Sequence, residues 1–372
     1  MPPVAYLDWN ASAPLRPEAR AALLDALALT GNPSSVHAAG RAVRRLVEEA
    51  RADIAALAGA PAEAVVFTSG GTESNALALR GSVLPVATTA VEHASVLAAR
   101  DDALRIPVDG DGVVRLDALA AMLAARGPML VSVMMANNET GVIQPVAEIA
   151  ALLHRHGGYL HCDAVQAVGR IPVDMAAQGI DMLTLSAHKL GGSQGVGALV
   201  VRSGPRPAAL LRGGGQEQGS RAGTENVAGI AAFGAAARIA RMRLAEMQSV
   251  ARLRDTLETA ACRAAPATRV LGAGAPRLCN TSCLALPGAE SATLVMAMDL
   301  AGIAISAGSA CSSGKVRASH VLAAMGLPAE IVAGAVRVSL GPATTPAEID
   351  AFVRLWADLA ARIASRQPAV AA

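Results

Sequence analysis

Lys189 is the residue whose surroundings most clearly suggest chemistry. It follows a short apolar run and precedes a glycine pair, in the segment Leu183-Thr-Leu-Ser-Ala-His-Lys189-Leu-Gly-Gly192. Partial removal from water lowers the pKa of a lysine, because desolvation disfavours the ammonium form, and the amine then becomes a nucleophile toward carbonyl groups. Most lysines are solvated surface groups, so this position gains weight only if other functional groups lie near it.

Two other loops add an anion site and a carboxylate. The segment Phe67-Thr-Ser-Gly-Gly-Thr-Glu-Ser-Asn75 is a glycine turn that leads into a helix. Free backbone N–H groups and the helix dipole suit a phosphate there, and Thr72 adds a hydroxyl donor. The turn is neither a Walker loop nor Gly-x-Gly-x-x-Gly. Asp163 ends a strand-like run in His161-Cys-Asp163, where the alternative role is a helix N-cap.

Together these groups match the needs of one cofactor. Pyridoxal phosphate requires a lysine for its Schiff base, an acidic partner for its pyridine nitrogen and donors for its phosphate. Lys189, Asp163 and Thr72 supply these three, and Ser186 and His188 stand beside the lysine. His93, in Val91-Glu-His-Ala94, could stack on the ring, the alternative being an ordinary residue at a helix N-terminus.

Two residues of the C-terminal part complete the set. Cys311 lies in Ile305-Ser-Ala-Gly-Ser-Ala-Cys311-Ser-Ser-Gly314, whose Gly and Ser content predicts a mobile, exposed loop. Because access to the thiolate decides cysteine reactivity, this cysteine is a candidate nucleophile, although it could also be a small residue in a turn. Arg337 interrupts the apolar run 335–340, and such an arginine pairs with a carboxylate of the protein or, bidentately, of a substrate.

The other cysteines and histidines do not predict a metal site. The cysteines are odd in number and form no CxxC pair, so no disulfide framework is expected: Cys162, Cys262, Cys279, Cys283 and Cys311. Cys279 and Cys283 are interpreted as small residues on one face of a strand. A second cluster, His154, His156, His161, Cys162 and Asp163, lacks the spacing of zinc ligands.

The elements that position these residues follow from the hydrophobic pattern. Strand-like segments are predicted at 64–68, 85–89, 104–108, 129–134, 159–162, 182–185 and 197–201. Helical patterns fall at 41–58, from residue 73, at 116–125 and at 146–154. This alternation predicts an α/β fold with a mainly parallel sheet covered on both faces, whose ligands bind at the carboxyl ends of the strands.

A second, smaller domain is expected at the C-terminal end. A long Ala-rich helix at 227–261 leads into strands at 277–286 and 335–340 and a final helix from Pro346. We therefore expect a large cofactor-binding domain over 15–260 and a small α+β domain over 261–372. The N-terminal segment 1–14 would join the small domain, which would carry the cysteine loop 306–314.

Composition restricts the partners. The 372 residues carry 32 basic and 30 acidic side chains, a net charge of +2, so no basic excess is available for nucleic acid. Although 53% of the residues are hydrophobic, Gly and Arg interrupt apolar stretches such as 228–240 well short of the ~20 residues of a spanning helix. The start has no basic segment before an apolar run. We expect a soluble, cytoplasmic protein with no membrane or direct nucleic-acid partner.

The ordered motifs resemble those of the cysteine desulfurases. The resemblance is to their first class, the nitrogen-fixation and iron–sulfur assembly type, within the class-V aminotransferase family. It runs nearly end to end, through Tyr6-Leu-Asp8, Gly31-Asn-Pro-Ser-Ser-Val-His37, Phe67 to Asn75, Asn137-Asn-Glu-Thr-Gly141, His161 to Gly169, Ser186 to Lys189, Arg221-Ala-Gly-Thr-Glu-Asn226, Gly308 to Gly314 and Arg337-Val-Ser-Leu-Gly341. It implies a homodimer with the type I fold of pyridoxal-phosphate enzymes.

The resemblance also implies a role for each site residue. Lys189 would hold the cofactor as a Schiff base, Asp163 would pair with its pyridine nitrogen and Gln166 with its phenolic oxygen. His93 would stack on the ring and help move protons, and Asn138 would line the same site. The residues implied in phosphate binding are Gly71, Thr72, Ser186 and His188, with Thr224 from the partner subunit.

The reaction implied is conversion of L-cysteine to L-alanine with transfer of sulfur. Arg337, with Asn32, would hold the substrate carboxylate, and Cys311 would take the sulfur as a persulfide. An acceptor protein would then receive it, mainly for iron–sulfur cluster assembly. The alternatives are a selenocysteine lyase, another class-V lyase or aminotransferase, and a non-catalytic scaffold. Departures from the family pattern leave the acceptor open: Trp9, Met135, Gln194, Gln218 and Ser220.

Overall fold

A seven-stranded sheet organises the larger part of the molecule, as a computed structural model that describes residues 5–308 and 319–365 shows. Its strands are β2 (Val65–Thr68), β3 (Val86–Thr89), β4 (Leu104–Ile106), β5 (Leu130–Met134), β6 (Tyr159–Asp163), β7 (Met182–Ser186) and β8 (Gly197–Val201). Their order is β2-β8-β7-β6-β5-β3-β4. The pairs from β7 to β4 are parallel, and β8 pairs antiparallel with both β2 and β7. The predicted α/β class is confirmed.

Helices cover both faces of this sheet, which explains the continuous apolar strands. Successive side chains point to opposite faces. Leu183 and Leu185 thus join the core that is shared with α2 (Ala38–Ala58), α5 (Leu116–Arg126), α6 (Val146–Arg155) and α7 (Val227–Met242). Met182 instead faces the core under α3 (Gly71–Arg80) and α4 (Ala94–Leu97). Both faces are therefore apolar, as expected for a buried parallel sheet.

A smaller unit has a sheet and a core of its own. Its sheet runs β12-β13-β10-β9 with antiparallel pairs, from β9 (Arg269–Val270), β10 (Thr281–Ala285), β12 (Ser306–Ala307) and β13 (Ala335–Ser339). The N-terminal β1 (Ala5–Tyr6) pairs in parallel with β11 (Ile303–Ala304). The helices around it are α8 (Met247–Ala264), α9 (Ser291–Leu300), α10 (His320–Ala324), α11 (Ala329–Ala333) and α12 (Pro346–Ala364).

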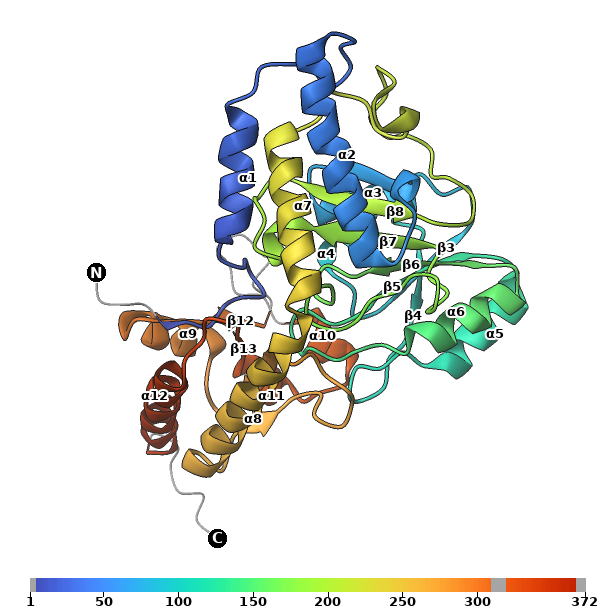
Figure 1. Ribbon diagram of the computed structural model, residues 1–372. Helices are drawn as coiled ribbons and strands as arrows, with labels where there is room; N and C mark the ends of the chain where they lie inside the picture. The colour runs from blue at the N-terminus through green and yellow to red at the C-terminus, as the bar shows by residue number, and fades with distance from the viewer. Residues whose placement is uncertain (1–4, 309–318, 366–372) are drawn as a thin grey trace.

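The predicted continuous helix at 227–261 is wrong. Helix α7 ends at Met242, a 3₁₀ turn covers Leu244–Glu246, and α8 begins at Met247. Helix α7 packs against α2 and α1 (Pro17–Leu27) in the first core, whereas α8 packs against α12 in the second core (Figure 1). One straight helix could not serve both cores, and we therefore propose the domain boundary near residue 243, not at 260.

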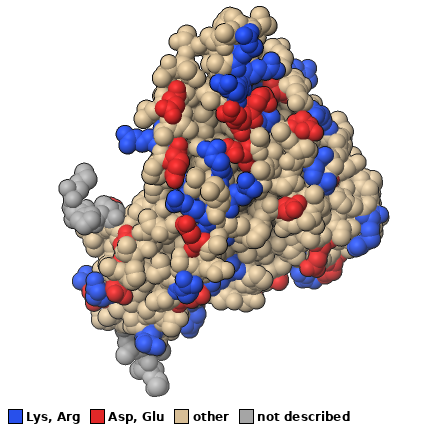
Figure 2. Space-filling view, viewed as in Figure 1, with Lys and Arg blue, Asp and Glu red and all other residues tan. Residues whose placement is uncertain are grey.

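Neither sign of charge dominates the face of the molecule that Figure 2 shows. Acidic and basic side chains are interspersed on the face shown in Figure 2. In the ranges 5–308 and 319–365, no helix is long and apolar enough to cross a membrane.

Candidate active site

A cavity of about 270 Å³ opens at the carboxyl ends of the parallel strands. Asp163 and Ser186 are the last residues of the neighbouring strands β6 and β7, and Asn138 follows β5. The smaller unit contributes Arg337 from β13. The cavity collects most of the predicted site residues: Gly71, Thr72, His93, Asn138, Asp163, Gln166, Ser186, His188, Lys189 and Arg337.

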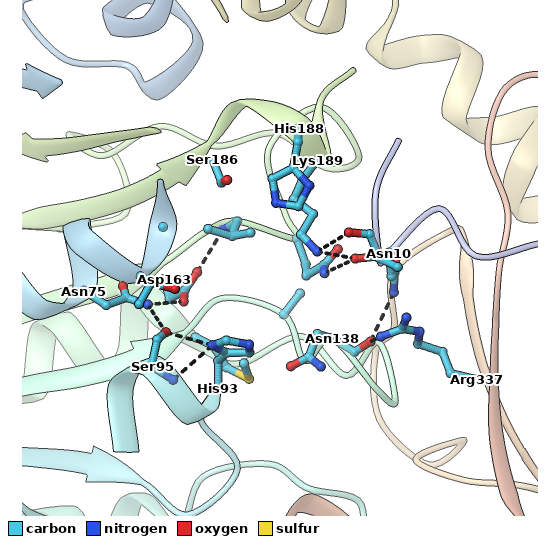
Figure 3. A pocket seen from close by; sticks show the side chains of 17 residues that line it. Asn10, Asn75, His93, Ser95, Asn138, Asp163, Ser186, His188, Lys189 and Arg337 are labelled. Atoms are coloured by element: carbon cyan, nitrogen blue, oxygen red, sulfur yellow. Dashed lines mark hydrogen bonds between the residues drawn. The ribbon is translucent and has the colours of Figure 1, made fainter. Parts of the chain in front are cut away.

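Lys189 lies on a 3₁₀ turn (Ala187–Lys189) directly after β7. Its Nζ donates to the backbone carbonyl oxygens of Asn10 and Ala11, at 2.5 and 2.8 Å (Figure 3). The neighbouring His188 faces the hydroxyl of Ser12 across 3.3 Å. Burial, together with the charge of Lys189, lowers the pKa of His188 to about 4, so this imidazole is neutral at neutral pH. The N-terminal segment thus forms one wall of the cavity.

Asp163 is tied to His93 through two side chains that the sequence did not single out. Asn75 donates from Nδ2 to Oδ2 of Asp163 at 2.8 Å and to Oγ of Ser95 at 2.9 Å (Figure 3). Oγ of Ser95 lies 2.7 Å from Nδ1 of His93. Asn75 ends the predicted glycine-turn motif, a signal that could have identified it. The chain links the acid to the imidazole through neutral groups.

The contacts of His93 define its neutral tautomer. Its Nδ1 accepts from the backbone N–H of Ser95 at 3.1 Å, so Nδ1 carries no proton. The proton of the neutral ring is therefore on Nε2. Its side chain also caps α4, so the cap predicted as the alternative role is present in addition to its place on the cavity wall.

The N-terminus of α3 lies on the cavity wall. The helix begins at Gly71, two residues before the predicted start at Glu73. The first N–H groups of a helix have no partner within it, and the helix dipole places positive charge there. A Cβ on Gly71 would come within 3.1 Å of Cγ2 of Val165, so the absence of a side chain lets the start of α3 lie close to this residue. Ser186 and His188 lie beside it on the wall.

Arg337 enters from the smaller unit and already has a protein carboxylate. The residue is 2% exposed. Its Nη2 donates to Oδ1 of Asp8 at 2.7 Å and Nη1 to the carbonyl oxygen of Asn138 at 3.1 Å. Its buried Nε has no partner in the described part of the chain. A guanidinium has five N–H bonds, so several donors are left for an anion in the cavity. Of the two alternatives left by the sequence, the structure shows the protein carboxylate, Asp8.

Two buried acids are direct sequence neighbours of the cavity residues His93 and Asn138, and neither was predicted as a site residue. Glu92 precedes His93; burial raises its pKa to about 8, although Thr89 and the backbone of Met134 donate to it. Glu139 follows Asn138, and burial raises its pKa to about 7. Oγ of Ser319 donates to Glu139 at 2.5 Å. Both carboxyl groups hold protons more readily than exposed acids do.

Two predicted site residues are not on this wall, and a third lies outside the described residues. Asn32 is exposed in the loop between α1 and α2, where its side chain accepts from the backbone of Ser34 at 2.9 Å. Thr224 is exposed before α7. Cys311 and its neighbours 309–318 lie outside the described residues.

The remaining cysteines and histidines that the sequence analysis considered as metal ligands have structural surroundings instead. Cys283 lies buried in β10, whereas Cys279 precedes this strand, so the prediction that both share its face is wrong. His161 is enclosed between the hydroxyls of Ser132 and Thr184, each at 2.9 Å. Residues 5–308 and 319–365 contain no group of three His, Cys, Asp or Glu side chains that could hold a metal ion.

The chain matches one family model and many known proteins. The aminotransferase class-V model matches residues 5–352. A cysteine desulfurase of Cereibacter sphaeroides is 45% identical over 98% of this chain and 97% of its own. An X-ray structure of a NifS-like protein from Rickettsia africae has a TM-score of 0.89 and 33% identity, covering 96% of this chain and 99% of that one. A structure of SspA in complex with cysteine has a TM-score of 0.78 and 26% identity, covering 92% and 100%.

Proposed function

Because the chain belongs to the class-V aminotransferase family, and within it to the cysteine desulfurases, we propose that this cavity removes sulfur from L-cysteine and leaves L-alanine. The observation that carries the proposal is the meeting of Lys189, Asp163 and Arg337 in one cavity. A lysine and an acid from the larger unit face an arginine from the smaller one. This arrangement fits a cofactor between the first two and an amino-acid carboxylate at the third.

The family uses pyridoxal phosphate, and the residues present fit this group. The buried Oδ1 of Asn75 lacks a partner among the described residues, beside the carboxylate that would take the ring nitrogen. The start of α3 at Gly71, which lies on the cavity wall, fits a phosphate. When bound, the cofactor supplies an electron sink for the carbanions that form at the substrate.

Each wall of the cavity would hold a different part of the cofactor. Lys189 would bind it covalently, and Asp163 and Gln166 would take the pyridine nitrogen and the phenolic oxygen. His93 would cover the ring and help move protons. Phosphate would be held by Gly71, Thr72, Ser186, His188 and Thr224 of the partner subunit, an arrangement that requires the homodimer. Asn138 would complete the wall.

The substrate and its sulfur would be handled from the smaller unit. Arg337 would hold the carboxylate of L-cysteine through the donors that Asp8 and Asn138 leave available. Asn32, the second residue implied for this role, does not line the cavity of the same chain. The Cys311 thiolate would then form an S–S bond with the substrate sulfur while the C–S bond breaks. The electron pair of that bond stays with the substrate carbon, which takes a proton to give L-alanine.

The persulfide on Cys311 would pass its outer sulfur to an acceptor protein in the cytoplasm, mainly for iron–sulfur cluster assembly. Support comes from the motifs shared with the iron–sulfur assembly class. The acceptor would reach the thiol after alanine has formed, so the two half-reactions can be measured separately.

The test compares the holoenzyme with Cys311→Ser. Wild type incubated with L-cysteine and a thiol reductant should release alanine and sulfide in equal amounts. The variant should still change the cofactor spectrum on adding cysteine, because Lys189 and Arg337 remain, but should form almost no alanine. Near-normal alanine from Cys311→Ser would favour a lyase that needs no cysteine nucleophile. An absence of turnover by wild type with L-cysteine would reject the proposed function.

A further inference from the structure

Arg170 is a buried cation that the proposed function does not use. It follows β6 in the turn 164–171 and is 8% exposed. Other buried or nearly buried arginines have a carboxylate partner: Arg51 pairs with Glu217 and Arg337 with Asp8. Within residues 5–308 and 319–365, no carboxylate pairs with Arg170. Burial lowers the pKa of Arg170 to about 10, so the guanidinium is still protonated at neutral pH.

The contacts of Arg170 are directed at one residue of the cavity. Its Nη1 donates to the backbone carbonyl oxygen of Gln166 at 2.6 Å and to the side-chain Oε1 of the same glutamine. A guanidinium has donors and no acceptor, so only the oxygen of the amide can face it. The orientation of this amide, which is ambiguous in many structures, is therefore decided by the chemistry of its partner.

The other end of the amide must then face the cavity. Nε2 of Gln166 donates to the carbonyl oxygen of Asn10 at 3.0 Å, the same oxygen that accepts from Nζ of Lys189. The NH₂ group is thus held at the lysine end of the cavity. Without the guanidinium, the amide could turn over and present its oxygen to the cofactor, where a negatively charged phenolic oxygen would be repelled.

We propose that Arg170 is a positioning residue that holds the Gln166 amide with its NH₂ group toward the phenolic oxygen of the cofactor. The inference rests on the proposed place of pyridoxal phosphate between Lys189 and Asp163. The buried charge of Arg170 also polarises the Gln166 amide, because linked hydrogen bonds strengthen one another. In addition, a nearby cation favours the anionic form of the cofactor's phenolic oxygen. In this arrangement the cofactor supplies the negative charge that compensates the charge of Arg170, and the Gln166 side chain lies between the two.

The test compares Arg170→Met with Arg170→Lys, which keeps a charge and a donor. The full-length apoprotein of each variant is titrated with pyridoxal phosphate, and the pH midpoint of the bound cofactor's visible absorbance is measured. Arg170→Met should weaken cofactor binding about tenfold, the size of one charge-assisted hydrogen bond. It should also raise the pH midpoint by about one unit, because a neighbouring positive charge has been lost. Arg170→Lys should restore much of both values.

A Gln166→Ala background decides whether Arg170 acts through the glutamine. There, Arg170→Met should add little further change, because the two residues form one linked unit. An equal shift in both backgrounds would overturn the positioning role, as would an Arg170→Met protein that binds and titrates like wild type. If the methionine variant does not fold, Arg170→Gln, which is neutral and of similar length, replaces it in the same comparison. Wild type that binds no pyridoxal phosphate would instead reject the proposed function.

Discussion

Replacing Arg337 by alanine distinguishes two roles of this arginine: binding the substrate carboxylate (a substrate clamp), or only stabilising the fold through its ion pair with Asp8. The arginine is nearly inaccessible, and its partner Asp8 has a side chain that is 15% exposed. Loss of one member of a buried ion pair costs about 3–5 kcal/mol. Because Ser306 still donates to Asp8 at 2.8 Å, we expect a destabilisation of about 3 kcal/mol, at the low end of that range.

The effect on cysteine should be separable from this loss of stability. A charge-assisted pair with the substrate carboxylate contributes about 1.5–3 kcal/mol, so Arg337→Ala should raise the KM for L-cysteine about 10- to 150-fold. Arg337→Lys should restore part of this, because an ammonium cannot form two parallel bonds to a carboxylate. The matched control is Asp8→Asn, which breaks the same ion pair from outside the cavity lining.

The assay measures thermal unfolding and cysteine dependence on the same preparations. Both Arg337→Ala and Asp8→Asn should lower the melting temperature, but Asp8→Asn should leave KM unchanged or lower it, since Arg337 then has a further donor for the substrate. The clamp is refuted if Arg337→Ala leaves KM unchanged. It is also refuted if Asp8→Asn raises KM as much as Arg337→Ala does, because the guanidinium would then act only through the packing of the cavity.

Three further predictions follow from the geometry. Lys189→Ala should abolish the visible absorbance of the covalently bound cofactor. The sequence holds only one other lysine, Lys315, so borohydride labelling of a peptide with Lys315 would exclude Lys189 as the attachment site. The raised pKa of Glu92 means that this carboxyl's contribution to stability falls as the pH rises from about 4.5 to about 8, because the unfolded chain ionises first. In urea unfolding at several pH values, Glu92→Gln should therefore lose less stability than wild type over this range. Arg51→Met should destabilise the protein by about 3 kcal/mol, because Arg51 holds the buried carboxylate of Glu217 by two hydrogen bonds of 2.9 Å. The exposed pair Arg238–Asp53 provides the control, since Arg238→Ala should cost less than ~1 kcal/mol. Equal losses of stability in the two variants would contradict the burial argument.

Local sequence determined the elements and much of the site. The strand at 197–201 is found where the apolar pattern predicts it, and those at 129–134 and 182–185 differ by a residue at one end. A buried parallel strand carries its signal within a few residues, since both of its faces must be apolar. Lys189 and Asp163 could be identified in the same way, because each stands directly after such a strand and so reaches the ligand-binding edge of the sheet.

Tertiary structure decided everything that joins distant segments. The contact of Arg337 with Asp8, the carbonyl oxygens of residues 10 and 11 at Lys189, and the break between α7 and α8 arise where two separately packed cores meet. The Gln166 amide combines both levels: Arg170, which holds its oxygen, is a neighbour in sequence, whereas the carbonyl oxygen of Asn10 that accepts from its NH₂ group comes from a distant segment. Helical and strand periodicities record which face of an element is buried, but not against which partner. These contacts depend on side chains far apart in the sequence that meet only after both cores have formed.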